Sequence, residues 1–475
     1  MPKALAIFVL GSEVRQFGHS GLLSRLLDDG WQVDAAAKII DDDLRAQLDR
    51  RVVYRPLPLA PLSFLAAQAQ MVLDEANALR MSASGARRWS YGRAVQPANW
   101  KQAFLFRAQR AAARSLRKLS LLHRVAAWVE RRLIHDQGKR IWSTLLDEAR
   151  PDIILVNIPK AGNIAAGLAL AKARNIPTLL LYHTWKDVTV ASGRINHSFT
   201  AIGVWNEWMR SQLLEQNPTV RPQSVAIAGC LHFESIGRHE RHIPEAAFRQ
   251  LLGLKPDTRI ILFTASAPWV VDGEEAYLEI IQRAIDDGEL PADVEIVVRT
   301  NPMDHLGVLR GVLERALPRV LVTSPDWRWD RSRNWCFQRT SDNHLYDTLL
   351  HLTSVNVSVP STVTVECAIA DLPVVNIGFS PPPVESMQDD ILSFWNADFY
   401  EDVRLTGAAS LARSPRELIE LVRSTLENRA QHQVSRQALV RRQLGVSPGE
   451  ALEAAVTVVK DAYGATHSKR PVQTL

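Results

Sequence analysis

The segment VSVPSTVTVECAIADLPVVNIGF, from Val357 to Phe379, places hydroxyl and carboxylate side chains where a strand gives way to a helix. Ser361 and Thr362 stand where the helix would begin, and Glu366 follows about one turn later. Unpaired N–H groups at such a start bind phosphate, and Ser361 and Thr362 would add hydroxyl donors. Glu366 would accept from ribose hydroxyls. A capped helix with an acid in its first turn explains the same residues through stability alone.

Two other strand ends in the second half of the chain carry polar residues. Arg299 ends an apolar run and could supply positive charge to a phosphate, while Asn301 could donate a hydrogen bond. Ser266 follows the first strand of this half, and small residues there would let the backbone approach a diphosphate. The alternatives are a strand-end arginine beside a turn proline at Pro302, and a tight turn at Ser266.

His19 is a candidate general base in the first half of the chain. It follows the first apolar strand, and an imidazole is suited to taking a proton from an acceptor hydroxyl. A histidine at a helix start can also simply cap or pack. Asp187, Glu13 and Arg15 compete for a catalytic role, so the identity of the base stays open.

Several sites are excluded by the motifs that the sequence lacks. It contains no GxxxxGK[ST], no GxGxxG after the first strand and no HExxH, so we expect neither a P-loop nor a dinucleotide cofactor. Asp41, Asp42 and Asp43 could bind a metal, but they open an apparent helix, where acids stabilise the N-terminus. We therefore expect no metal and no cofactor. Three cysteines without a CxxC pair suit a reducing cytoplasm.

Positive charge is concentrated in one segment. The chain carries a net charge of +5, yet residues Arg87–Arg140 contain fourteen Lys and Arg and only two acids. A basic helical stretch with interspersed Leu and Trp fits an anionic membrane surface or a lipid-linked diphosphate. A solvated helix face is the alternative, and no module for nucleic acid is recognisable. No apolar run reaches the length needed to span a bilayer.

Alternating strands and helices must position these residues. The pattern predicts two serial α/β domains, residues 1–231 and 232–475, with a helical insertion at about 63–148 in the first. The last helix, Pro448 to Tyr463, is a candidate to cross back onto the first domain. Apolar Ala4–Leu10 is interpreted as the first strand and not as a signal peptide, because it lacks a basic leader and a cleavage site.

The Val357–Phe379 segment resembles the donor-binding helix of GT-B glycosyltransferases, particularly bacterial surface-polysaccharide transferases with the pattern STvtxEa…PvvnigF. The segments Gly11–Val33, His183–Asp187 and Val204–Asn206 agree with that family, as does Arg299–Pro302. Related transferases often carry a His-Pro pair where this chain has Asn301-Pro302. Those with small lipophilic acceptors often keep a histidine as base after the first strand, which His19 resembles.

The resemblance implies two Rossmann-like, doubly wound domains facing a cleft. The cysteines and the basic segment add the expectation of a cytoplasmic enzyme peripheral to the inner face of the cell membrane. It implies sugar transfer from a nucleotide-sugar donor to a surface polysaccharide, such as capsule or lipopolysaccharide, or to a lipid-linked glycan. His19 or Asp187 would act as the base without a metal, and nucleic acid is not an expected partner.

Two alternatives remain. A nucleotide-sugar 2-epimerase shares the fold but should carry a glycine pair where this chain has Ser361-Thr362. A non-catalytic scaffold subunit of a polysaccharide assembly complex would bind the nucleotide without turnover.

Overall fold

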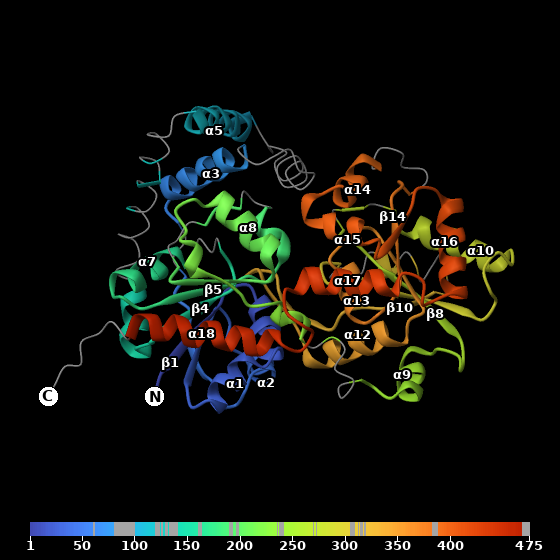
Figure 1. The fold of residues 1–475 in the computed structure, drawn as a ribbon, viewed down its shortest axis with the longest axis horizontal. Coiled ribbons are helices and arrows are strands. Elements are labelled where there is room, and N and C mark those ends of the chain that lie inside the picture. The colour runs from blue at the N-terminus through green and yellow to red at the C-terminus, as the bar shows by residue number, and fades with distance from the viewer. Residues whose placement is uncertain are drawn as a thin grey trace. The chain divides into compact units, whose positions relative to one another are not determined.

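The chain forms two compact α/β units in a computed structural model, and each unit is described by itself. The first comprises Met1–His232, Trp329–Phe337 and Leu444–Leu475, and the second comprises Phe233–Arg328 and Gln338–Gln443. The structure describes residues 1–59, 62–79, 100–118, 124, 127–128, 132, 141–159, 164–189, 193–195, 199–234, 236, 242–268, 270–271, 273–304, 309–311, 313, 317, 320–381 and 388–467. Figure 1 shows both units.

Unit 1 contains a parallel sheet of seven strands among the described residues, in the order β3-β2-β1-β4-β5-β6-β7. Most of its strands are short apolar runs buried on both faces, the pattern that parallel sheets require. They are β1 (Lys3–Phe8), β2 (Gln32–Ala37), β3 (Val53–Pro56), β4 (Ile153–Val156), β5 (Thr178–Leu181), β6 (Ala201–Val204) and β7 (Val225–Ile227).

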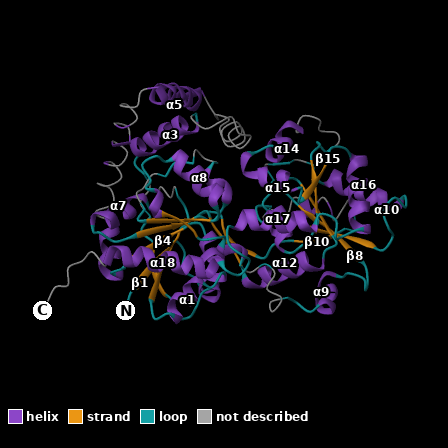
Figure 2. Cartoon of the chain, viewed as in Figure 1, coloured by secondary structure: helices purple, strands orange, loops and turns teal. Residues whose placement is uncertain are grey.

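Helices alternate with these strands, as Figure 2 shows by colour. They are the π-helix η1 (Val14–His19), α1 (Leu22–Asp28), α2 (Asp42–Gln47), α7 (Ala165–Ala173), α8 (Glu207–Gln216), the 3-10 helices η2 (Trp185–Val188), η4 (Pro222–Ser224) and η5 (Leu231–Phe233), and α18 (Ala451–His467). The last helix, α18, packs against α1 within this unit, where Lys460 pairs with Asp29 at 2.9 Å.

Two further helices form the described part of the predicted insertion. These are α3 (Phe64–Ala78) and α5 (Trp100–Lys118), which lie side by side (Figure 1). Leu73 and Ala76 of α3 pack with Ala113 and Leu116 of α5 in a small apolar cluster. Arg194 of the Rossmann-like body contacts Asp74 of α3 at 2.7 Å.

Unit 2 contains a parallel sheet of six strands among its described residues, in the order β10-β9-β8-β13-β14-β15. The strands are β8 (Arg259–Thr264), β9 (Val294–Arg299), β10 (Leu321–Thr323), β13 (Val355–Ser358), β14 (Val374–Ile377) and β15 (Ala409–Ala412). The helices are α9 (Glu245–Leu252), α10 (Glu275–Asp286), α12 (Thr340–Leu352), α13 (Val363–Ile369), α14 (Gln388–Trp395), η8 (Asp398–Tyr400), α15 (Glu401–Thr406), α16 (Pro415–Glu427) and α17 (Gln433–Leu444).

Both sheets reverse their strand order at an internal point. The reversal lies between β1 and β4 in unit 1 and between β8 and β13 in unit 2. Ligands of doubly wound folds bind beyond the carboxyl ends of the strands at such a switch point. The topology therefore directs the search for a site to the loops that follow these four strands.

A hairpin that the strand-helix pattern did not predict connects β10 to α12. It consists of β11 (Trp327–Asp330) and β12 (Trp335–Gln338), and its residues 329–337 group with unit 1. Trp335 and Phe337 enter the unit 1 core. The Cys336 amide donates to the Leu10 carbonyl oxygen at 2.9 Å, and a Cβ on Gly11 would lie 2.0 Å from the Cys336 carbonyl oxygen. Gly11, with φ +98°, is therefore required where the hairpin meets the loop after β1.

Candidate functional site

Three of the predicted donor-binding segments meet at one edge of the unit 2 sheet. β8 lies between β9 and β13, all three parallel. Ser266 follows β8, Asn301 follows β9 and Ser361 follows β13. The structure thus brings these residues to the carboxyl ends of neighbouring strands, and Ser266 and Ser361 flank the switch point.

The start of α13 leaves its hydroxyl groups unused for capping. Thr362 occupies the N-cap position with helical torsions, φ −59° and ψ −26°, and its side chain makes no cap hydrogen bond. Ser361 and Thr362 are partly exposed, and among the described residues neither hydroxyl makes a hydrogen bond. The capped-helix interpretation therefore does not explain why hydroxyl residues stand here. Because α13 has only seven residues, its dipole adds little.

Glu366 is a buried carboxylate behind that start. It is 6% exposed, and the hydroxyl of Tyr346 on α12 donates to its Oε2 at 2.6 Å. Side chains of a helix tilt toward its N-terminus, so Glu366 leans toward Ser361 and Thr362. Tyr346 could not be identified from the sequence, because no local pattern indicates that α12 packs against α13.

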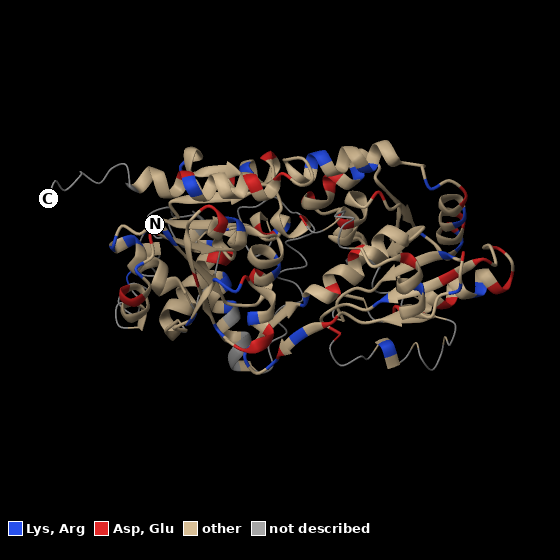
Figure 3. Ribbon diagram, turned by 90° about the horizontal axis from the view of Figure 1, so that it is seen from below, with Lys and Arg blue, Asp and Glu red and all other residues tan. Residues whose placement is uncertain are grey.

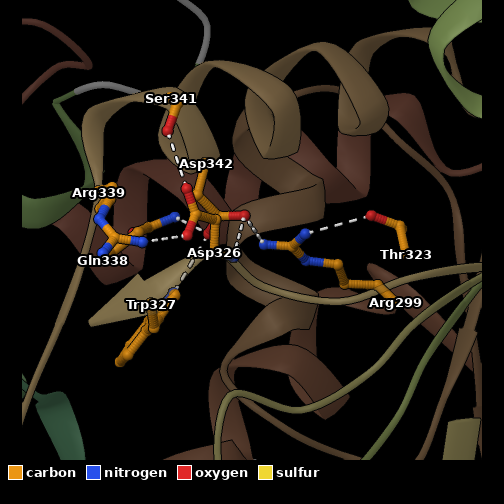
Figure 4. A network of polar contacts seen from close by, with 8 residues as sticks. All are labelled: Arg299, Thr323, Asp326, Trp327, Gln338, Arg339, Ser341 and Asp342. Carbon is orange, nitrogen blue, oxygen red and sulfur yellow. Dashed lines mark hydrogen bonds and ion pairs between the residues drawn. The ribbon is translucent and has the colours of Figure 1, made fainter. Parts of the chain in front are cut away.

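Arg299, predicted to supply positive charge to a phosphate, is already paired. Its guanidinium donates to Asp342 Oδ1 at 2.6 Å, and the two side chains are 7% and 0% exposed (Figure 4). Asp342 also accepts from the Asp326 amide, from Trp327 Nε1 and from Gln338 Nε2, at 3.0, 3.2 and 3.0 Å. This network offsets the charge of Arg299 with a buried carboxylate, and its role as a phosphate contact stays a prediction.

Hydrogen bonds within the protein also hold the loops after β8 and β9. Both carboxylate oxygens of Glu274 accept from the Ser266 amide, at 3.0 and 3.1 Å, and burial raises the pKa of Glu274 to about 7. The Asn301 side chain accepts from the Met303 amide at 2.9 Å and so closes its own turn. The Ser266 amide therefore does not point freely toward a ligand, although its side chain is partly exposed.

At the switch point of unit 1, hydrogen bonds join three residues that the sequence motifs did not single out as catalytic. Asn157, just after β4, donates to Ser12 Oγ at 3.3 Å. His183, just after β5, contacts the Asn157 carbonyl oxygen through Nδ1 at 3.2 Å. Their positions directly after parallel strands were the available signal.

Asp187, a predicted catalytic residue, belongs to the same group. Its Oδ2 lies 3.6 Å from His183 Nδ1, with the two side chains 24% and 29% exposed. If Nδ1 carries the proton and faces the Asn157 carbonyl, Nε2 is left as the acceptor. Within the described residues Nε2 of His183 has no hydrogen-bond partner, so this atom can take a proton from a ligand.

His19, the other predicted base, lies elsewhere in unit 1. It ends the π-helix η1, and its Nε2 is 3.3 Å from Oε1 of Gln47 at the end of α2. This side chain therefore faces the β2–α2 side and not Asn157. A π-helix after the first strand is uncommon, and such helices are frequent at functional sites.

Glu13, another candidate for a catalytic role in unit 1, is enclosed by the surrounding protein. It is fully buried, and its carboxylate accepts from the amides of Val9, Leu10 and Gly11 at 3.1, 3.3 and 2.7 Å. Burial raises the pKa of Glu13, and these hydrogen bonds lower it in part. A carboxylate buried in this way holds the loop after β1 and is not exposed to solvent.

Burial disfavours the charged forms of two basic side chains near this edge of the sheet. Desolvation, with the charges of Arg15 and His183, lowers the pKa of His232 well below its ordinary value. Desolvation likewise lowers the pKa of Lys186. A negatively charged ligand bound beside these groups would favour their protonated forms.

Of the three aspartates considered for a metal, Asp41 caps α2, and Asp42 and Asp43 lie in its first turn. Asp41 Oδ1 accepts from the Leu44 amide at 2.9 Å at the start of α2. In the part of the chain that the structure describes, no group of three or more His, Cys, Asp or Glu side chains is arranged to hold a metal ion.

The described part of the basic segment is amphipathic. Residues Gln109, Ala113 and Leu116 of α5 are buried, while Trp100 and Phe104 are 75% and 70% exposed. Arg107 and Arg114 are exposed and continue the aromatic stripe at helical spacing. Residues 80–99, and most of 119–140, lie outside the described residues. No described helix combines the length and apolar character needed to cross a membrane.

Known proteins resemble this chain in fold and not in sequence. No protein-family model and no curated protein matches it. S. aureus MnaA in its co-structure with UDP is 12% identical, with a TM-score of 0.56 over 100% of both chains. A UDP-GlcNAc 2-epimerase from Neisseria meningitidis, bound to UDP-GlcNAc, is also 12% identical, with a TM-score of 0.55 over 97% of this chain and 100% of that one. A glycosyltransferase from Rickettsia africae is 10% identical, with a TM-score of 0.51 over 99% of each. The predicted fold, two Rossmann-like domains of the GT-B type, is confirmed.

Proposed function

We propose that the chain is a glycosyltransferase that holds a nucleotide-sugar donor in unit 2 and transfers the sugar to a surface polysaccharide or lipid-linked glycan. The observation that carries the proposal is the pair of hydroxyls at Ser361 and Thr362. They stand at the switch point beside a buried carboxylate and take no part in capping α13. Hydroxyls suit the diphosphate, and the Glu366 carboxylate suits the ribose.

We place the group that accepts the proton of the acceptor hydroxyl in unit 1. Of the two predicted bases, Asp187 lies with His183 and Asn157 at the switch point, whereas His19 faces Gln47. We infer that His183 Nε2 takes the proton while Asp187 and the Asn157 carbonyl oxygen hold the ring. The acceptor oxygen then bonds to the anomeric carbon, and the nucleoside diphosphate leaves with the electron pair of the broken bond.

Binding of a nucleoside diphosphate tests the proposal most directly. A panel of UDP, GDP, ADP and CDP should contain one that raises the unfolding temperature. A ligand at about 100 times its Kd stabilises a protein by about 2.7 kcal/mol. The wild-type chain should then release that diphosphate from the matching nucleotide sugar when the acceptor is present. Binding without release of the diphosphate would identify a scaffold subunit. The absence of binding would exclude both a glycosyltransferase and a scaffold subunit.

A 2-epimerase is the second candidate, because one of the similar structures is a UDP-GlcNAc 2-epimerase bound to UDP-GlcNAc. Against it, Ser361-Thr362 stands where a glycine pair would be expected. Inversion at C2 requires that the C2–H bond break. Incubation of UDP-GlcNAc with the protein in D2O would therefore place deuterium at C2 if the chain is an epimerase, and proton NMR would detect it.

The outer face of α5 is proposed to contact an anionic membrane that carries the acceptor. Six Lys and Arg residues and no acid occur in α5, whereas α18 carries both signs (Figure 3). Its described outer stripe combines Trp100, Phe104, Arg107 and Arg114, opposite the side chains that pack on α3. Aromatic and arginine side chains on one exposed face suit the boundary between headgroups and acyl chains.

A further inference from the structure

Tyr346 connects two residues that the sequence predicted independently. Its side chain is largely buried on α12, and its hydroxyl donates to Glu366 at 2.6 Å. The guanidinium carbon of Arg299 lies 5.5 Å from the centre of its ring. A cation over an aromatic face is attracted by the ring, so Arg299 holds Tyr346 from the side of β9.

The guanidinium of Arg299 is itself held in place by a buried carboxylate. Asp342 holds the guanidinium at 2.6 Å and is completely buried, with three further donors around its carboxylate. Asp342 and Tyr346 are four residues apart on α12, so one helix turn presents both (Figure 4 shows the Asp342 part). Asp342, Arg299, Tyr346 and Glu366 thus form a connected row that ends at the carboxylate.

We propose that Tyr346 is a positioning residue that sets the orientation of Glu366 for the ribose of the donor. The inference rests on the proposed function and adds a residue to it. A carboxylate has about four lone-pair positions, so the bond from Tyr346 occupies only part of its capacity. A glutamate held by this bond is already ordered when the nucleotide arrives, whereas a released one loses rotamer freedom on binding.

The role predicts a loss of ribose discrimination. Tyr346→Phe removes the hydroxyl and leaves the ring under Arg299. The variant should bind the nucleoside diphosphate about tenfold more weakly, the change that follows from ordering one long side chain. Its affinities for the 2′-deoxy and 3′-deoxy forms should fall much less, because those ligands lack a hydroxyl that Glu366 binds. Affinity for inorganic pyrophosphate should stay unchanged.

Tyr277→Phe is the matched control. Tyr277 is also buried in unit 2, and its hydroxyl donates to the Phe379 carbonyl oxygen at the same distance of 2.6 Å. Loss of this hydroxyl should cost comparable stability and leave the ribose discrimination intact. Equal discrimination in both variants and the wild type would overturn the inference, as would a similar loss in both variants.

A double-mutant cycle separates positioning from general damage. Isothermal titration with the diphosphate of UDP, GDP, ADP or CDP that binds wild type most tightly gives Kd for Tyr346→Phe, Glu366→Ala and the double variant. If Tyr346 acts through Glu366, the double variant binds like Glu366→Ala alone. Additive losses would overturn the inference while leaving nucleotide binding established. Absence of binding by the wild type would instead overturn the proposed function.

Discussion

The carboxyl edges of the two sheets share a topology and differ in chemistry. In unit 1 the switch point carries His183 and Asp187, groups that can exchange a proton. In unit 2 it carries Ser361, Thr362 and Glu366, groups that can donate or accept hydrogen bonds. The proposed function assigns proton transfer to the first edge and donor recognition to the second. Loops after parallel strands can differ in this way because they vary freely above a shared arrangement of backbone.

The loop after the first strand shows the same contrast on a smaller scale. A buried glutamate ties this loop in each unit: Glu13 holds three successive amides after β1, and Glu274 holds the single amide of Ser266 after β8. Burial raises the pKa of both carboxyls, to about 7 for Glu274. More amide donors stabilise the ionised form better. The loop of unit 2 is therefore the one expected to respond to pH.

Removal of the proton acceptor should have the largest effect. His183→Asn should lower turnover by roughly 10²–10⁴-fold, the usual loss for a general base, with nucleotide affinity unchanged. Asp187→Asn should lower it less, and His19→Ala least. The measurement is release of diphosphate from the nucleotide sugar that stabilises the chain most. If only His19→Ala is inactive, the base belongs to the end of η1 and the edge described for unit 1 is not reactive.

The pH response of the unit 2 loop comes next. The pKa of Glu274 is raised from 4.5 to about 7 in the folded state, so the protonated form stabilises the fold below pH 4.5. That contribution is lost as the pH rises toward 7 and above, and amounts to about 3 kcal/mol at 1.4 kcal/mol per pKa unit.

Urea unfolding of wild type and Glu274→Gln at pH 5 and pH 8 measures this contribution. The stability advantage of the wild type should be larger at pH 5, and Glu13→Gln serves as the comparison from unit 1. An advantage that is equal at both pH values would mean that Glu274 is ionised throughout, as expected of a carboxylate with several amide donors.

Loss of the proposed contact between Glu366 and the ribose should have an effect of intermediate size. Glu366→Ala should weaken nucleoside diphosphate binding by about 1–3 kcal/mol, the range for hydrogen bonds to a charged group. The same substitution should leave the pH dependence of turnover unaltered, since that belongs to unit 1. Calorimetry gives the affinity. Unchanged affinity would move the nucleotide away from α13.

The smallest effect is expected at α5. Arg107→Gln and Arg114→Gln should each weaken binding to anionic vesicles by about 1 kcal/mol, or roughly fivefold. Arg416→Gln on α16 of unit 2 is the control, because its side chain is 89% exposed. Vesicle sedimentation at two salt concentrations measures the difference. Equal binding to neutral and anionic vesicles would assign the basic face of α5 to another partner.

Strand ends were the most predictable part of the site. Apolar runs bounded by turns predicted the parallel strands, and the residue after each run then had to lie at the carboxyl edge. Local pattern was therefore enough to bring Ser266, Asn301 and Ser361 to one edge of a sheet. The pairings Arg299–Asp342 and Tyr346–Glu366 could not be predicted, since each joins residues on different elements whose packing the local pattern does not contain.

The amino-acid sequence by itself determined the two successive α/β units, because periodicity is a local property of each segment. Only the tertiary structure decided which charged and titratable side chains remain available to contact a ligand. It paired Arg299 with Asp342, sealed Glu13 under three amides, turned His19 toward Gln47 and set His183 beside Asp187. Whether a side chain meets solvent, a partner or a ligand depends on distances across the fold, and those distances arise only when the sheets and helices pack.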